Sequence, residues 1–189
     1  METAHSAVKT SRLEEYQPPV YLVDEVVLDV DIHDGVTTVT STLSLQHNPA
    51  SPVPAGEMSF NGEGLVLRSL VLDGVVLEEE RYEYRDSQLI VRGLPECCQL
   101  TSIVDIEPEK NTALDGLYRS NGMYCTQCEA EGFRRITFFP DRPDVLARFT
   151  TTVRADKKRY PLLLSNGNPV EQGEEGDRHW VTWEDPFPK

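Results

Sequence analysis

The residues YLVDEVVLDVDI (21–32), HDG (33–35) and VTTVTSTLSL (36–45) read as two neighbouring strands joined by a short turn. Towards its end the first stretch alternates apolar and polar residues, as a half-buried strand does. The second stretch is rich in β-branched residues, which favour strands. Gly35 can take the positive φ that a tight turn needs. Together they predict an antiparallel hairpin at the start of the fold.

Short strands bounded by Gly, Pro or Asp recur along the rest of the chain. Helical periodicity is scarce, and only 144–149 is predicted to make a turn of helix. The fold class is therefore expected to be mainly β: an antiparallel β-sandwich or saddle-like sheet domain with little helix. Further strands are predicted at 65–72, 75–77, 82–84, 88–91, 100–106, 136–139, 150–153, 162–164 and 180–183.

The chain divides into an arm and one domain. Residues 1–19 are polar, lack a period and end on Gln17-Pro18-Pro19, which predicts an extended N-terminal arm. Residues 20–189 are predicted to form a single β-sandwich domain with a sizeable core. The first thirty residues lack the features of a secretory signal, and no apolar run approaches the roughly 20 residues that span a bilayer. The protein is expected to be soluble and cytoplasmic.

The charge balance limits the partners. Against 18 Lys and Arg residues stand 32 Asp and Glu residues, for a net charge of -14. This balance offers no basic footprint for phosphate backbones or anionic lipids. We expect neither nucleic acid nor a membrane as a partner, and we expect a monomer.

The four cysteines form two close pairs, Cys97-Cys98 and Cys125-Thr126-Gln127-Cys128. A structural zinc site needs four ligands, and two adjacent sulfurs suit one tetrahedral ion poorly. A redox Cys-x-x-Cys belongs at a strand-to-helix turn, which this chain does not predict. We therefore interpret all four as ordinary thiols and expect no metal site in this chain. The histidines have no metal-like spacing either: His5, His33, His47 and His179.

Between 108 and 132 the strand pattern stops, and such a long irregular segment is uncommon in a compact domain unless it is functional. It contains Glu129-Ala130-Glu131, two carboxylates that could hold a cation or do acid and base work. In a chain with 32 acidic residues, however, two such glutamates are more often simply solvated. The chain has no Gly-x-Ser-x-Gly, no Gly-rich phosphate loop and no His-Glu-x-x-His.

This segment and its surroundings resemble the N-terminal domain of the bacterial aminopeptidase N family, whose members are zinc-dependent peptidases. FNGE (60–63) and LP (94–95) are local agreements in the first half, where the strand layout is also similar. The second half matches in order, through NTALDGLY (111–118), CTQCEAEGFR (125–134), DRPDVLARF (141–149), LLSNGN (163–168) and WEDPFPK (183–189).

The resemblance implies a division of labour in a longer enzyme that removes N-terminal amino acids from peptides. Glu129 matches the glutamate of the family's Gln-x-Glu, which holds the substrate's α-ammonium, and Gln127 matches its glutamine. For Gln127 a hydrogen bond that only orders the loop is an equal alternative, and Glu131 is assigned to structure. The catalytic residues and the zinc ligands belong to a downstream catalytic domain of the same polypeptide, absent from this chain, so the chain alone is expected to be inactive.

A second hypothesis from another class remains open. The chain could be a stand-alone β-sandwich binding or interaction module without enzymatic activity. The sequence shows no aromatic array of the kind that binds sugars, and the Cys-Thr-Gln-Cys-Glu-Ala-Glu-Gly segment favours the first hypothesis. The sequence does not indicate which N-terminal residue a substrate would carry.

Overall fold

A computed structural model describes residues 12–189. Within them, helical structure is limited to three 3-10 turns: η1 (Leu13–Glu15), η2 (Glu79–Arg81) and η3 (Phe133–Arg135). None of these is long or apolar enough to cross a membrane. The strands are β1 (Tyr21–Ile32), β2 (Thr37–His47), β3 (Glu57–Asn61), β4 (Val66–Leu72), β5 (Val75–Val76), β6 (Tyr82–Arg85), β7 (Gln88–Arg92), β8 (Cys97–Ile106), β9 (Gly116–Ser120), β10 (Met123–Gln127), β11 (Arg148–Asp156), β12 (Asn168–Glu175) and β13 (Arg178–Asp185).

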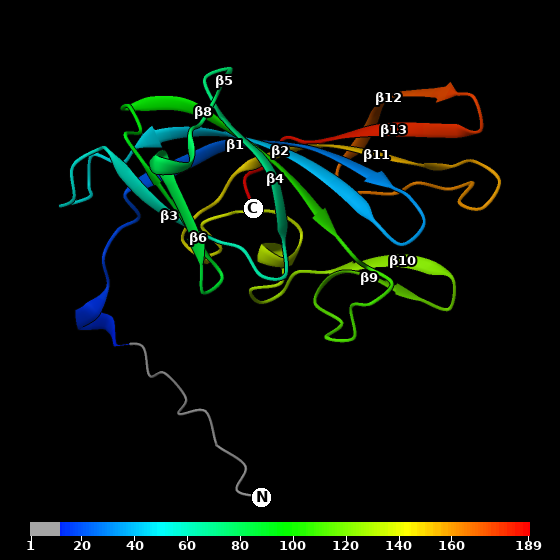
Figure 1. The fold of residues 1–189 in the computed structure, drawn as a ribbon, viewed down its shortest axis with the longest axis horizontal. Coiled ribbons are helices and arrows are strands. Elements are labelled where there is room, and N and C mark those ends of the chain that lie inside the picture. Colours follow the sequence, from blue (N-terminus) through cyan, green and yellow to red (C-terminus); the bar gives the residue numbers. More distant parts are fainter. Residues whose placement is uncertain (1–11) are drawn as a thin grey trace, which may run out of the picture.

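The strands form one large sheet, one small sheet and a separate hairpin. Eight strands pair in the order β12-β13-β11-β1-β2-β8-β4-β5, three in the order β3-β7-β6, and β9 pairs only with β10. In Figure 1 the large sheet runs across the top of the molecule, with β3 and β6 below its left part and the β9–β10 hairpin below its right part. The mainly β, sandwich-like fold class is confirmed.

The predicted first hairpin is the centre of this structure. β1 and β2 pair antiparallel from Tyr21 opposite His47 to Ile32 opposite Thr37. The turn between them is closed by a backbone hydrogen bond from His33 N to Val36 O of 3.1 Å, and Gly35 has a φ of +78°. Along β2 every second residue is buried from Thr37 to Leu45, so the alternation in the sequence corresponds to one face turned inward.

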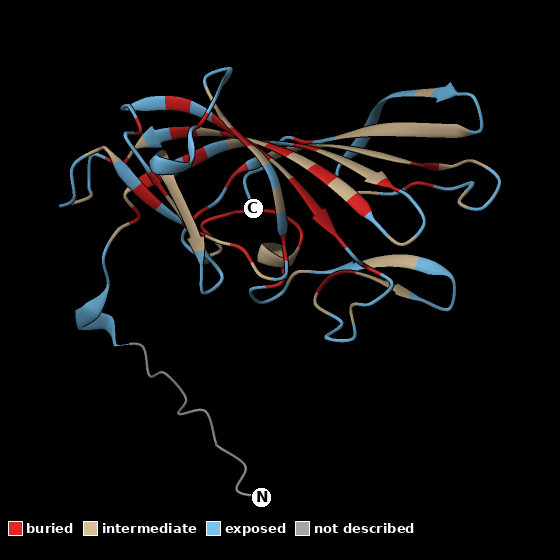
Figure 2. Cartoon of the chain, viewed as in Figure 1, coloured by how far each residue is buried: buried red, intermediate tan, exposed pale blue. Residues whose placement is uncertain are grey.

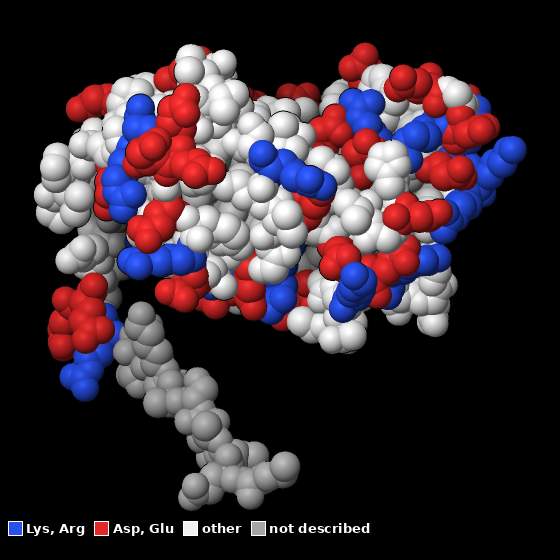
Figure 3. All heavy atoms as spheres, in the orientation of Figure 1, with Lys and Arg blue, Asp and Glu red and all other residues white. Residues whose placement is uncertain are grey.

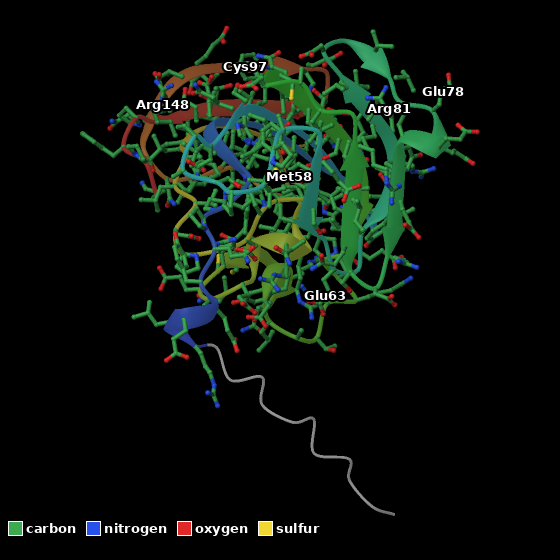
Figure 4. All side chains as sticks on the ribbon, turned by 90° about the vertical axis from the view of Figure 1, so that its left-hand side faces the viewer. Met58, Glu63, Glu78, Arg81, Cys97 and Arg148 are labelled. Carbon is green, nitrogen blue, oxygen red and sulfur yellow. The ribbon has the colours of Figure 1, made fainter. Side chains whose placement is uncertain are left out.

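The core lies between the two sheets. Met58 and Phe60 on β3 and Leu89 on β7 belong to the same buried cluster as Leu43 on β2 and Val104 on β8. Met58 lies well inside the molecule in Figure 4. Figure 2 shows buried residues along the central strands, whereas β12 and the β4–β5 turn are largely exposed. Apolar burial of this kind stabilises the sandwich by roughly 25 cal/mol per Å².

Not every pair is antiparallel. β11 runs parallel to β1, with Val26 opposite Phe149 and Val30 opposite Val153. β13 and then β12 extend the sheet beyond β11. The sheet is therefore mixed: it is antiparallel as predicted except at this pair, which the sequence did not predict. A parallel partner needs a long connection and leaves no local turn signal, which is why the sequence did not show it.

The helical turn predicted at 144–149 is absent. Residues 142–145 form a reverse turn with a hydrogen bond from Val145 N to Arg142 O of 3.2 Å. Ala147 exchanges two backbone hydrogen bonds with Lys189, at 3.0 and 3.1 Å, and Arg148 already pairs with β1. Tertiary strand pairing overrides the weak local preference for helix.

Two predicted strands are also absent, and four observed strands were not predicted. Segment 136–139 contributes only an isolated bridge from Phe139 to Asn61, and 162–164 is extended without a strand partner. Leu163 is buried while its two neighbours are exposed. The strands not predicted are β3, β9, β10 and β12.

Part of the predicted arm lies outside the described residues, which begin at 12. Within the described part, Tyr16 donates a hydrogen bond to the Asp144 carboxylate at 3.1 Å, and Gln17 O accepts one from Arg142 at 2.8 Å. Asn48 binds Pro19 O at 2.9 Å. The boundary between arm and domain near residue 20 stays a prediction.

Candidate functional site

The segment singled out in the sequence contains the β9–β10 hairpin. The prediction that 108–132 lacks strands was wrong. The two strands β9 and β10 lie in this segment and are joined by the Asn121-Gly122 turn, whose two central residues have φ values of +49° and +83°. Asn-Gly is among the strongest short-range hairpin signals and could have revealed this element. The hairpin matters for the site because β10 ends at Gln127, at the start of the candidate loop.

The loop 128–132 is closed tightly behind β10. Gly132 N donates a hydrogen bond to Cys128 O at 2.8 Å, and the Glu129-Ala130 peptide bond is cis. A Cβ on Gly132 would lie 2.4 Å from Gln127 O and 2.8 Å from the Cys128 Cα, so only glycine fits there. Glu131 takes a positive φ of +72°. The backbone therefore presents Glu129 and Ala130 at the tip of a short loop.

η3 anchors the far side of this loop. Arg134 donates from Nε to Asp141 Oδ2 at 2.9 Å and from Nη2 to Asp141 O at 3.0 Å, and its backbone N donates to the same carboxylate at 3.2 Å. Arg135 forms an ion pair with Glu63, which follows β3 and is labelled in Figure 4. These partners were not predicted, because residues so far apart give no sequence signal of their contact.

A cavity of about 940 Å³ opens beside the loop. One wall comes from the large sheet, with Leu28 and Val30 on β1 and Phe149 and Val153 on β11. The opposite side is formed by β10, by 128–131 and by the 160–166 segment. The lining is mostly apolar, as in many sites that bind small molecules or peptides.

Four acidic and two basic side chains line this cavity, and Glu129 differs from the other five. Within residues 12–189 it is the only one of the six without an ion pair, and it is exposed. An unpaired carboxylate at an apolar wall can accept a cation. The pairs that engage the others are Asp141–Arg134, Glu131–Arg134, Asp185–Lys189 and Arg142–Asp144. Figure 3 shows acidic and basic side chains interspersed over one face of the molecule.

Gln127 lies beside this cavity and is not among the residues that line it. Its side chain is exposed, and Nε2 donates a hydrogen bond to the backbone O of Glu129 at 2.9 Å. The loop-ordering hydrogen bond considered from the sequence is therefore present. It connects the end of β10 with the residue that carries the candidate carboxylate.

All four cysteines are free thiols in the structure. Cys125 and Cys128 both line the cavity, and Cys128 also packs against the main core. Burial raises the pKa of the Cys128 thiol to about 11. A neutral thiol is a poor metal ligand and nucleophile. In the described part of the chain, no group of three or more His, Cys, Asp or Glu side chains could hold a metal ion.

The fold places the chain among mainly β domains built from facing sheets, with an apolar cavity at one end. Within that class it belongs to the family described as the Peptidase M1 N-terminal domain, whose sequence model matches residues 24–189.

Several relatives are similar over almost the whole chain. Aminopeptidase N of Escherichia coli is 47% identical over 176 residues, 93% of this chain and 20% of that protein. Aminopeptidase N of Caulobacter vibrioides is 44% identical over 94% of this chain and 20% of its own length. This chain therefore spans about a fifth of the length of these curated relatives.

Solved structures agree with the sequence relatives. Legionella pneumophila aminopeptidase A, in complex with aspartic acid, superposes with a TM-score of 0.90 at 32% identity, over 95% of this chain and 21% of that one. An M1 zinc metallopeptidase from Deinococcus radiodurans superposes with a TM-score of 0.75 at 16% identity, which shows a shared fold alone. The comparisons give no support to a stand-alone binding module.

Proposed function

We propose that this chain is the N-terminal domain of a zinc-dependent aminopeptidase and that Glu129 binds the α-ammonium of the peptide substrate. The observation that carries the proposal is the state of Glu129: it lines an apolar cavity and has no ion-pair partner within residues 12–189. The two bacterial relatives described above are aminopeptidases. An aminopeptidase acts on peptides with a free amino terminus. Both lines of support point to a cation as the ligand of this carboxylate.

The physical requirement is a directed negative charge. A buried ammonium without a partner costs several kcal/mol, so a substrate amine that leaves water must meet a carboxylate. A peptide with a blocked amino terminus would leave Glu129 unpaired and bind more weakly. This difference selects for cleavage at the amino terminus and against cleavage inside a chain.

Gln127 has a supporting part in the proposal. Its amide nitrogen already bonds to Glu129 O, which orders the loop, and its amide oxygen is available to a substrate near the first side chain. Glu131 has a structural role, because its Oε1 forms an ion pair with Arg134 Nη2 at 3.4 Å. We assign no catalytic residue to this chain.

The remainder of the full-length protein would supply the zinc ligands and the catalytic groups. The described residues do not offer a donor set that could hold zinc. The downstream catalytic domain is the proposed partner of the cavity face. Four apolar side chains on the cavity lining are more than half exposed, a surface suited to being covered: Met123, Leu146, Leu162 and Leu164. The proposal also places the protein in the cytoplasm, where its four thiols would stay reduced.

The test is the Glu129→Ala substitution in the full-length enzyme. We expect KM for an aminoacyl anilide to rise roughly 10-fold to 100-fold, because the substrate loses a hydrogen bond to a charged group, and we expect a smaller change in kcat. Steady-state kinetics measures both. Glu129→Gln keeps the shape and should show most of the same rise.

Glu131→Gln is the matched control, since that carboxylate lies in the same loop but pairs with Arg134. Its KM should stay within about twofold of the parent value. Unchanged kinetics in both Glu129 variants would remove Glu129 from the substrate site.

A further inference from the structure

The β9–β10 hairpin has no strand partner in either of the larger sheets within residues 12–189. A two-stranded hairpin is marginally stable at best without other support. Since β10 ends at Gln127, directly before the loop that carries Glu129, the contacts that hold the hairpin also determine where that carboxylate lies.

The base of the hairpin is fixed by close backbone contact. A Cβ on Gly116 would lie 2.6 Å from the Arg135 Cβ and 3.1 Å from Gly132 O, and Leu117 is buried in the main core. These contacts hold one end of the hairpin. They leave the rest of β10 to be held by other groups.

Tyr124 supplies that second attachment. Its ring packs edge-on against Tyr160, with centroids 5.3 Å apart and planes at 62°. Its hydroxyl donates a hydrogen bond to Glu109 Oε1 at 3.0 Å. Arg119, directly opposite Tyr124 on β9, donates to the same oxygen at 3.0 Å and lies over the Tyr124 ring at 5.7 Å. The Glu109 carboxylate therefore accepts a hydrogen bond from a side chain on each strand of the hairpin.

Tyr160, which packs against Tyr124, is itself held by the large sheet. Tyr160 N donates to Asp156 O, at the end of β11, at 2.9 Å, and the His179 ring on β13 bonds to Tyr160 O at 2.7 Å. Tyr124 packs against both hydrophobic clusters of the molecule. Burial and the bond to Glu109 raise the pKa of Tyr124, so its hydroxyl stays a donor throughout the neutral range.

We propose that Tyr124 is a positioning residue for the substrate loop: by tying β10 to Glu109 and Tyr160, it fixes where the Glu129 carboxylate lies on the cavity wall. Tyr124 lies three residues before Gln127 and five before Glu129. Without it β10 loses its own side-chain attachment, whereas β9 keeps the bonds from Arg119 to Glu109 Oε1 and to Pro108 O. This inference rests on the proposed function of Glu129.

The test uses the full-length enzyme with Tyr124→Phe, which keeps the ring against Tyr160 and removes only the hydroxyl. We expect KM for an aminoacyl anilide to rise roughly threefold to tenfold, with kcat within about twofold, because the hydroxyl acts only through the position of Glu129 and the carboxylate itself is still present. Glu109→Ala removes this bond together with the bond from Arg119 and should raise KM at least as much. Tyr118→Phe is the matched control on the same hairpin, where no hydrogen bond to the hydroxyl is present within residues 12–189, and KM should not change.

A double-mutant cycle separates positioning from general destabilisation. If Tyr124 acts through Glu129, Tyr124→Phe should have no further effect on KM in a Glu129→Ala background. Full additivity of the two changes, or an unchanged KM in Tyr124→Phe and Glu109→Ala, would overturn the positioning role. A Glu129→Ala enzyme with normal KM would instead contradict the proposed function itself, so the two failures are distinguishable.

Discussion

Glu129 and Glu131 stand two residues apart in one loop, yet their carboxylates have different surroundings. Glu131 lies 3.4 Å from Arg134, and within residues 12–189 Glu129 has no ionic partner although it lines the same cavity. While the cavity is open to water, the unpaired charge costs little. Once the cavity is covered, desolvation makes a cationic partner strongly favourable. The residue type alone does not distinguish these two glutamates.

Two of the cysteines should also differ in reactivity, because their surroundings differ. Cys97 is exposed, whereas Cys128 is half-buried with its thiol pKa raised by burial to about 11. At pH 8 we expect a short pulse of iodoacetamide to label Cys97 and to leave Cys128 largely unlabelled, because the thiolate is the reacting form. Labelling of Cys128 should increase as the pH approaches 11.

Peptide mass spectrometry measures the labelling, and denatured protein, in which every thiol is accessible, is the control. Equal rates for the two cysteines at pH 8 in the native protein would contradict the burial of Cys128.

At the scale of the element, β2 is one of the two central strands of the large sheet. It pairs with β1 on one side and with β8 on the other, and its residues alternate between the core and the opposite face. Leu43 is 2% exposed, whereas Thr40 lies on the other face and is half-buried. The strand therefore offers two substitutions that separate core packing from strand propensity.

We expect Leu43→Ala to lower the free energy of unfolding by about 2–5 kcal/mol, because it removes buried methyl groups and leaves a cavity in the core between the two sheets. Thr40→Ala should lower it by less than about 1 kcal/mol. Urea unfolding followed by tryptophan fluorescence measures both. Similar losses in the two variants would mean that strand propensity, and not the core, dominates the stability of β2.

At the scale of the whole molecule, the small sheet packs with the large sheet over only part of its length. Below the other part lie the cavity, the β9–β10 hairpin and the 160–166 segment (Figure 1). The exposed apolar lining and the unpaired Glu129 lie on this same side. This is the side on which we propose that the downstream catalytic domain packs.

We expect the isolated 189-residue chain to have no peptidase activity. The proposal assigns it a substrate carboxylate but neither a zinc site nor a catalytic group. Incubation of the purified chain with an aminoacyl anilide and added zinc, beside the full-length enzyme as a positive control, measures this. Sustained turnover that copurifies with the chain would contradict the division of labour between the two parts of the protein.

Local patterns were enough to predict the mainly β class and the 21–45 hairpin, because alternation and turn chemistry depend on neighbouring residues. They also directed attention to the segment that contains Glu129. The Asn121-Gly122 turn was equally local and was overlooked, whereas β3 and β12 are short or highly polar strands with weak patterns.

Sequence patterns indicated which residues alternate between inside and outside, where the first chain reversal occurs and, through a resemblance, which loop to consider as a site. The parallel pairing of β11 with β1, the absence of helix at 144–149 and the contact of Tyr124 with Glu109 emerge only in the folded chain. The same is true of the ion pairs of the acids that line the cavity, among which Glu129 has no partner within residues 12–189. Periodicity and turn preference act between near neighbours, whereas strand pairing and ion pairing join residues that are distant in the chain.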